Sequence, residues 1–162
     1  GSERTGAPVV AFCRIDDKEI RLREPIMQPD ALIIQDPTLL HQVDVFGGLK
    51  KDGFILINTT RTFNQLGLEE FSKGFRSEHL LTVPATELAL KHVGRPVPNV
   101  PLLGAFAALG GLISIEAVHS AIQQKFKGAV AQGNMAAATQ AYEIVMEQER
   151  QAEEAAKEKQ HA

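Results

Sequence analysis

Paired carboxylates are the first groups in this sequence that could perform acid–base chemistry. The pairs are Asp16-Asp17 and Glu69-Glu70. The first pair falls in a polar turn and the second in the opening turn of a predicted helix. Turn geometry and the helix dipole explain acidic residues at both places without catalysis. We therefore predict that the chain carries no catalytic residue of its own.

A second set of polar residues stands where two predicted strands end. These residues are Asp36, followed later in the chain by Asn58, Thr59 and Arg61. Each group comes directly after a continuous apolar run that is typical of a buried strand. Ligands of parallel α/β sheets bind at the carboxyl ends of the strands, so fold-level analogy predicts a small-ligand pocket here. The alternative is that these residues only terminate the strands.

Histidine and cysteine are too scattered to predict a metal site. The five histidines stand singly, and neither a nucleophile elbow nor a phosphate-binding loop occurs. Cys13 is the single cysteine, so the chain cannot hold an iron–sulfur cluster alone. It lies in an apolar run, and we expect a buried structural thiol in a reducing compartment. Any redox metal is therefore expected on a partner.

Strand and helix patterns alternate around these residues. Predicted strands cover residues 31–34, 54–57 and 80–83, and predicted helices start near residue 38 and cover 68–75 and 85–93. This alternation predicts a three-layer α/β/α fold with a mostly parallel sheet, because parallel neighbours need a crossover that is usually helical. Residues 9–15 and 19–22 predict two further strands, which we expect to form an antiparallel N-terminal hairpin at the sheet edge.

The last third of the chain predicts helices only. Residues 95–101 form a proline-rich connector, and residues 102–113 predict a buried helix whose glycines allow another backbone to approach closely. A further helix is predicted over 115–126 with Ser114 as its N-cap, and another from Asn134. Residues 149–162 are charged and predict a helical extension or a fraying tail, with a partner-binding arm as the alternative.

Composition narrows the class of protein. The 162 residues, 44% of them hydrophobic, can bury the core of one domain. A net charge of −3 leaves no basic surplus for nucleic-acid phosphates. No uninterrupted apolar run reaches the ~20 residues of a membrane span, and no charged-then-apolar leader opens the chain. We therefore expect a cytoplasmic protein with no nucleic-acid or membrane partner.

A series of short motifs follows one order along the chain. The opening run Gly1–Val9 leads into Ala11–Ile15, and further motifs stand at Pro25-Ile26, Pro29–Ile34, Leu49–Gly53, Asn58-Thr59, Thr82–Thr86, Asn99 and Leu103–Ala105. This ordered set resembles the gamma subunits of 2-oxoacid:ferredoxin oxidoreductases, in particular those of the pyruvate type. The resemblance covers residues 1–148 as one domain, and residues 149–162 lie outside it.

The resemblance implies a non-catalytic or accessory subunit of an enzyme that oxidatively decarboxylates a 2-oxoacid to acyl-CoA and passes electrons to ferredoxin. Pyruvate is the substrate suggested by similarity, with acetyl-CoA as product. Partner subunits of alpha, beta and delta type are implied, as is a holoenzyme with thiamine diphosphate, Mg, iron–sulfur clusters and coenzyme A, none held by this chain alone. Glu3, Arg4 and Thr5 are implied to form an interface loop near the assembled active site; the alternative is a polar loop that caps the sheet.

The family pattern normally opens with a strand, a glycine-rich turn and a helix before the segment that begins this chain. We expect those elements to be missing here, through a shortened chain or because the chain is one section of a fused polypeptide. Two other classes of function stay open. One is a free-standing, flavodoxin-like nucleotide-binding module, and the other is a purely structural assembly subunit.

Overall fold

Three short parallel strands form the sheet of this protein. The computed structural model describes residues 6–161. The strands are β1 (Ala31–Ile34), β2 (Phe54–Asn58) and β3 (Leu80–Val83), and they pair in the order β1-β2-β3. All three lie at the predicted positions, and both pairings are parallel. The prediction of an α/β fold with a parallel sheet is therefore confirmed.

Both strand-to-strand crossovers run over one face of the sheet. They contain the 3-10 helix η1 (Pro37–His41), the short helix α1 (Glu69–Ser72) and the 3-10 helix η2 (Ser77–His79). Phe46, Phe71 and Phe75 stack in this layer, with ring centroids 4.2 and 4.9 Å apart along the series. They belong to a cluster that covers the buried side chains of Ile55 and Ile57. This outer layer consists of short helices and loops, and it is thinner than its counterpart on the opposite face.

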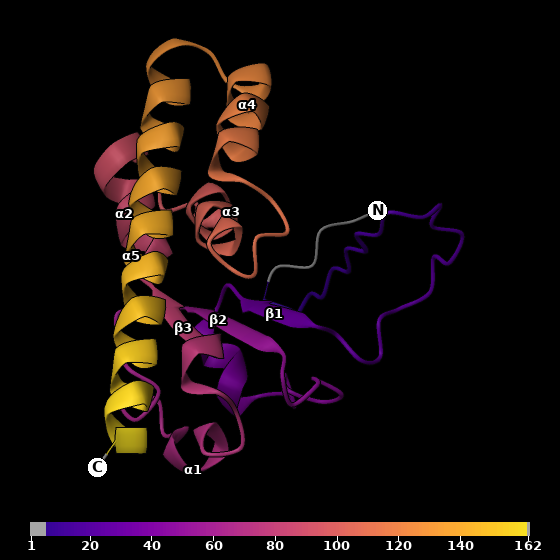
Figure 1. Ribbon diagram of the computed structural model, residues 1–162. Coiled ribbons are helices and arrows are strands. Elements are labelled where there is room, and N and C mark those ends of the chain that lie inside the picture. Colours follow the sequence, from indigo (N-terminus) through magenta and orange to yellow (C-terminus); the bar gives the residue numbers. More distant parts are fainter. Residues whose placement is uncertain (1–5, 162) are drawn as a thin grey trace.

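Four helices lie on the opposite side of the sheet, where the third along the chain packs on the helices beside it rather than on the sheet (Figure 1). They are α2 (Ala85–Val93), α3 (Asn99–Ala107), α4 (Ile115–Lys125) and α5 (Gly128–His161). The core on this side joins Leu56 and Val83 of the sheet to apolar residues of α2, α3 and α5. The predicted helix stop at Gly94 is confirmed, because this residue adopts φ 78°. Ser114 caps α4 as predicted, and its side chain accepts a hydrogen bond from the N–H of Ala117 at 3.0 Å.

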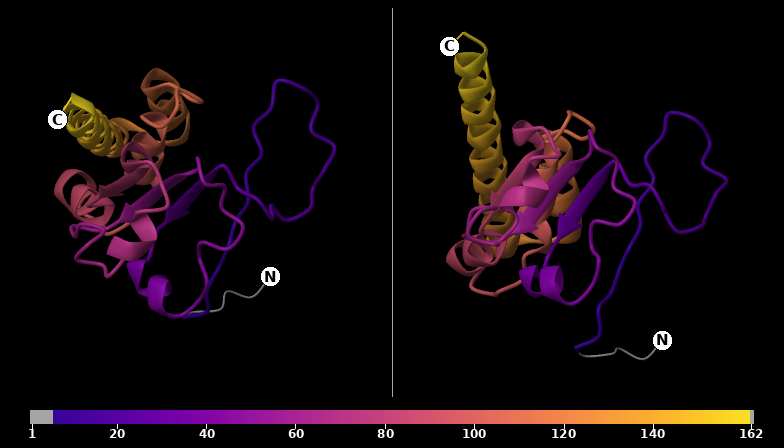
Figure 2. Two further views of the ribbon diagram at one scale, coloured as in Figure 1. Left: turned by 60° about the horizontal axis from the view of Figure 1, so that its bottom comes forward. Right: turned by 90° about the horizontal axis from the view of Figure 1, so that it is seen from below.

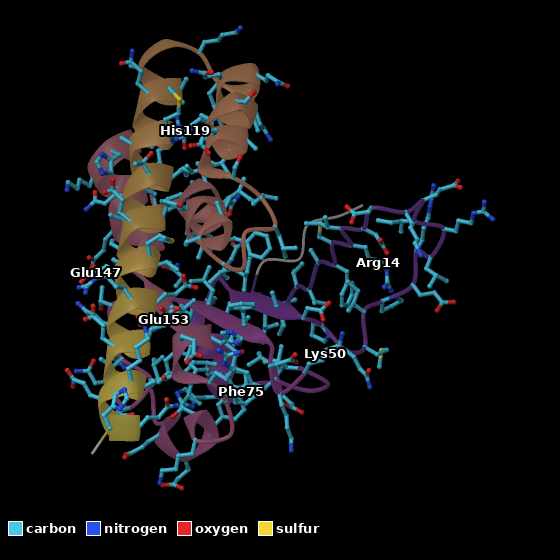
Figure 3. All side chains as sticks on the ribbon, viewed as in Figure 1. Arg14, Lys50, Phe75, His119, Glu147 and Glu153 are labelled. Carbon is cyan, nitrogen blue, oxygen red and sulfur yellow. The ribbon has the colours of Figure 1, made fainter. Side chains whose placement is uncertain are left out.

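Helix α5 is the longest element and packs against most of the others. Its 34 residues give a length of about 51 Å at 1.5 Å per residue, and it contacts α2, α3, α4 and β3. Gly104 of α3 packs directly on the backbone of Ala138 in α5, where a methyl group would overlap the carbonyl oxygen. The predicted close backbone approach is thus present at Gly104. Figure 3 shows His119 of α4 directed toward α5, where its Nε2 shares a 2.7 Å hydrogen bond with Thr139.

Three helices differ in their bounds from the prediction. Helix α1 covers only Glu69–Ser72 of the predicted range 68–75. Helix α3 begins at Asn99, because proline is tolerated in a first helical turn, and it ends before Gly110 and Gly111, which adopt φ 62° and 69°. Helix α5 begins at Gly128, six residues before the expected cap. Asn134 lies inside this helix and is buried, and its side chain donates to the Val130 carbonyl at 2.9 Å. The alanine-rich sequence around it sustains a helix that the polar residue does not interrupt.

The predicted N-terminal hairpin is absent from the structure. Residues 7–28, hereafter the N-terminal arm, contain no strand and project beside β1 as an open loop (Figures 1 and 2). A two-stranded hairpin without a third strand or a covering layer is marginal in water. Cys13 lies in this arm and is exposed, so the prediction of a buried thiol is wrong. The apolar side chains of the alternating pattern are exposed, and nothing among the described residues covers them.

Candidate functional site

Asn58 joins three strand ends at the carboxyl edge of the sheet. It is the last residue of β2 and only 8% exposed. Its amide nitrogen donates to the carbonyl oxygen of Gln35, just after β1, and to the hydroxyl of Thr86 in the first turn of α2, both at 2.9 Å. Its amide oxygen accepts from the N–H of Thr86 at 3.3 Å. Both amide hydrogens are therefore used inside the protein, which makes Asn58 a positioning residue for this edge.

Asp36 caps the 3-10 helix that follows β1. Its carboxylate accepts from the backbone N–H of Thr38 at 2.9 Å and from the Thr38 hydroxyl at 2.7 Å. These two hydrogen bonds, the one from the hydroxyl foremost, hold the pKa of Asp36 below its usual value. The carboxylate is consequently ionised at neutral pH and suits a helix cap better than a general acid.

The loop after β2 is fixed by short-range hydrogen bonds. The N–H of Thr59 donates to the carbonyl of Val83 at 3.0 Å, and its hydroxyl accepts from the N–H of Arg61 at 3.1 Å. Thr62 and Gln65 then exchange side-chain-to-backbone bonds of 2.9 and 3.2 Å. The guanidinium-bearing Arg61 is exposed beside this ordered turn. The structure thus brings Asn58, Thr59 and Arg61 together, with Asp36 one strand away.

The chemistry of this edge is that of hydrogen bonding rather than proton transfer. It offers an amide and hydroxyls, one ionised carboxylate and one exposed guanidinium, with no nucleophile paired to a base. Thr86 was missed by the sequence prediction although it holds Asn58 from both sides. In the sequence, the run Pro84-Ala85-Thr86 contributed only to the family resemblance. A threonine at the start of a helix is nevertheless a signal for a polar contact of this kind.

Two hollows of the described structure lie away from the predicted pocket. One, of about 200 Å³, opens at the amino ends of β1 and β2 and is lined by Asp30, Ala31, Asp52, Gly53, Phe54, Phe106, Leu109 and Leu112. Asp30, which lines this hollow, forms an ion pair with Lys50 at 2.6 Å, and the contact raises the pKa of that lysine. The other, of about 500 Å³, lies in the N-terminal arm. The pocket predicted at Asp36 and Asn58 stays a prediction.

The remaining predictions concern the interface loop, metal binding, membrane spans and the boundary at residue 148. Glu3, Arg4 and Thr5 lie outside the described residues. Over residues 6–161, no group of three or more His, Cys, Asp or Glu side chains gathers as a metal site would require. Within the same range, no helix combines the length and apolar character needed to cross a bilayer. The expected boundary at residue 148 falls inside α5, and residues 149–161 continue that helix.

Gln148 is a second contact that sequence reasoning missed. Its side chain accepts from the N–H of Thr82 at 3.1 Å and donates to the Thr82 carbonyl at 2.6 Å, so it pairs with the outer edge of β3 as a neighbouring strand would. The next residue, Glu149, is partly buried, and this desolvation, with the charge of Glu153 beside it, raises its pKa to about 7. Helix α5 is therefore attached to the edge of the sheet at Gln148.

Comparison with known proteins shows which proteins this chain is similar to in sequence. A family model described as "Pyruvate ferredoxin/flavodoxin oxidoreductase" matches residues 1–144. The common gamma subunit of pyruvate/ketoisovalerate oxidoreductases from Pyrococcus abyssi is 43% identical over 143 residues, covering 88% of this chain and 76% of that one. Pyruvate synthase subunit PorC from Methanocaldococcus jannaschii is 46% identical over 142 residues, covering 88% and 74%.

A solved structure is also similar. Pyruvate oxidoreductase subunit PORC from Thermotoga maritima superimposes with a TM-score of 0.63 at 30% sequence identity. The match covers 74% of this chain and 65% of that chain. The fold and the sequence therefore point to the same group of proteins.

Proposed function

This chain belongs to the pyruvate ferredoxin/flavodoxin oxidoreductase family, and from that membership we propose that it is the gamma-type accessory subunit of a 2-oxoacid:ferredoxin oxidoreductase that acts on pyruvate. The observation that carries the proposal is the 46% identity to a PorC subunit over 88% of the chain. Such an enzyme converts a 2-oxoacid and coenzyme A to acyl-CoA and carbon dioxide and delivers the electrons to ferredoxin. A cytoplasmic location belongs to the same proposal.

The residues of this chain support an accessory role. Its single thiol, Cys13, does not fit the ligand set of an iron–sulfur cluster, which needs several cysteines. The carboxyl edge of the sheet holds hydrogen-bonding groups that are largely engaged with one another. Thiamine diphosphate, Mg and the clusters are accordingly assigned to subunits of alpha, beta and delta type. Glu3, Arg4 and Thr5 are proposed to stand in the loop that meets those subunits.

Co-expression with candidate alpha, beta and delta subunits tests this proposal. The tagged chain should retain those subunits, and the complex should reduce viologen dyes when pyruvate and coenzyme A are both present. The matched control is the same co-expression without this chain, which should lose most of the activity. A tagged chain that retains no other subunit would contradict the proposal.

The same preparations separate the two alternatives. A purely structural assembly subunit predicts that the remaining subunits, once assembled, keep full activity after this chain is removed. A free-standing nucleotide-binding module predicts that the chain alone binds a flavin or adenine nucleotide, detected by a shift in its melting temperature. The engaged side chain of Asn58 favours neither nucleotide binding nor catalysis at the strand ends.

A further inference from the structure

The last part of α5 has no large apolar side chain to hold it in place. Residues 148–161, hereafter the C-terminal segment, contain alanine as their only apolar residue type. After Gln148, the half-buried side chains are those of Glu149, Ala152 and Ala156, which lie three or four residues apart on one face of the helix. A methyl group buries little apolar area. The C-terminal segment is therefore docked on the protein mainly by polar groups.

The preceding part of α5 is anchored in the core. Ala138, Ala141 and Val145 are all 0% exposed and belong to its apolar clusters. In Figure 1, the helix then continues past the strands in its yellow portion. Helix ends that few buried contacts hold unwind at a low cost in free energy. Opening of α5 can therefore be confined to the residues that follow Val145.

Gln148 connects the C-terminal segment to the sheet. Its two hydrogen bonds with Thr82 use both the N–H and the carbonyl of that residue. Among the described residues, no strand pairs with this edge of β3. Release of Gln148 would therefore bare two backbone groups at an edge where another strand can pair.

Glu149 places a carboxyl group in the docked face of the segment. Burial, and then the charge of Glu153, favours its protonated form and raises the pKa of Glu149 to about 7. Among the described residues, Glu149 forms no ion pair, and the neighbouring Arg150 pairs with Glu147 and Glu154 instead. An ionised Glu149 is thus a half-buried charge without a cation while the segment is docked, and release returns it to water.

The groups of η2 and β3, which both contact α5, do not neutralise this charge. Arg76, just before η2, is paired with Glu78. His79 stacks on Phe54 with ring centroids 4.0 Å apart, and its Nδ1 is buried without a hydrogen-bond partner. The strand β3 carries no ionisable side chain. The protonation state of Glu149 therefore decides how well the segment docks.

The polar contacts of α2 and α4 with α5 lie far from Glu149. They involve positions nine and ten residues earlier in α5, which is about 14 Å along the helix axis. Helix α3 carries no ionisable side chain. The contacts join Lys91 and His92 of α2 to Gln140, and His119 of α4 to Thr139.

We infer that the C-terminal segment is a latch on the outer edge of β3, which opens as Glu149 loses its proton and thereby bares the N–H and carbonyl of Thr82. The inference concerns this chain by itself and does not depend on the proposed function. The docked segment holds the proton of Glu149 with a pKa of about 7, and the released segment holds it with the ordinary value of 4.5. Release is therefore increasingly favoured as the pH rises from 4.5 to about 7, and it changes little above that. The latch tightens when the pH falls below neutral.

Hydrogen exchange of the Thr82 amide measures this opening, because that N–H is bonded to Gln148 while the latch is closed. Exchange is followed by NMR on the 15N-labelled chain, and each rate is divided by the rate of an unfolded peptide at the same pH. The resulting opening constant should rise at least about threefold between about pH 5.5 and pH 7.5. It should also be at least about tenfold larger than that of the Leu56 amide, which reports global unfolding from the centre of the sheet.

Three variants test the residues of the latch. Glu149→Gln keeps the shape of the side chain and removes its proton equilibrium, so the opening constant should change less than about twofold over the same pH range. Glu158→Gln is the matched control, because Glu158 is exposed in the same segment and the same charge is removed. This control should keep the rise with pH. Gln148→Ala should increase opening at every pH, since both bonds to Thr82 are lost.

Four results would overturn the inference. An opening constant at Thr82 that does not change with pH removes the latch, and a rise that persists in Glu149→Gln removes the role of Glu149. Equal opening constants at Thr82 and Leu56 would mean that the amide exchanges only through global unfolding. Loss of the rise in Glu158→Gln would assign it to the net charge of the segment and not to Glu149.

Discussion

Replacement of Gly104 by alanine is expected to destabilise the protein through one helix contact. Gly104 lies in α3 against the backbone of Ala138 in α5. A methyl group at this position would overlap the Ala138 carbonyl oxygen and lie 2.6 Å from the Ala138 Cα. Both of those atoms belong to the backbone, so no change of rotamer relieves the overlap.

The magnitude follows from two opposing effects. Alanine stabilises a helix by about 1 kcal/mol relative to glycine. Overpacking a well-packed contact costs about 1–3 kcal/mol, and more where the neighbour cannot move. Restoring an ordinary contact of about 3.5 Å requires the helices to separate by roughly 1 Å, which also loosens the core that Leu102 and Ala105 share with Ala141 and Val145. We expect a net loss of about 2 kcal/mol in the free energy of unfolding, from the upper part of the overpacking range.

Urea denaturation followed by circular dichroism at 222 nm measures this loss. A change of about 2 kcal/mol corresponds to a fall in Tm of about 4–8 °C for a protein of this size. Gly74→Ala is the matched control, because the nearest atom to its added methyl group is the Phe71 carbonyl oxygen at 3.6 Å. That control should stay within about 0.5 kcal/mol of the unmodified protein. Equal or greater stability of Gly104→Ala would refute the packing argument.

Three further predictions are measured by the same urea denaturation. Gln148→Ala should lower the free energy of unfolding by about 1–2 kcal/mol, because the N–H and carbonyl of Thr82 both lose their partner; an unchanged midpoint would contradict the contact. Asn58→Ala should lower the free energy of unfolding by about 2–3 kcal/mol, since it leaves partly buried groups at three strand ends unpaired. A loss below about 0.5 kcal/mol, which is typical of a surface substitution, would speak against that role. Glu149→Gln tests pH dependence. The folded-state pKa of Glu149 is raised from 4.5 to about 7, so the folded protein binds this proton more tightly than the unfolded chain does. The stability that this proton contributes is fully present below pH 4.5 and is lost as the pH rises through about 7. The variant should therefore be more stable at pH 8 by up to about 1 kcal/mol, a figure reduced for solvent screening, and equal to the unmodified protein near pH 4.5; a difference that does not change with pH would rule out the titration.

Local patterns predicted the sheet well. The run Phe54–Ile57 is continuous and apolar, as a strand covered on both faces requires, whereas Ile33 of the similar run Ala31–Ile34 is 40% exposed. The cap at Ser114 and the stop at Gly94 depend on side-chain and backbone chemistry within one turn, so they too could be read locally. These features share one property, which is that their causes lie within a few residues.

Features that depend on distant partners could not be predicted. Gln148 bonds to Thr82 across 66 positions of sequence, and Asn58 bonds to Thr86 across 28. Neither glutamine nor asparagine carries a local signal for such a partner. The role of Gly133 also depends on a residue far away in the sequence. A methyl group at this position would overlap the His92 carbonyl oxygen, so the glycine allows α5 to pack closely on α2 and does not mark a break before the next helix.

The two edges of the sheet differ in a way that limits how copies of this chain can associate. Gln148 occupies hydrogen-bonding groups at the outer edge of β3, so an added strand cannot pair there without displacing it. The outer edge of β1 is unpaired among the described residues. Edge-to-edge stacking into a fibre needs two open edges on each copy. Two chains could at most join β1 to β1, which gives a finite six-stranded sheet closed by a glutamine at each end. The sheet is thus able to accept one partner and then stop growing.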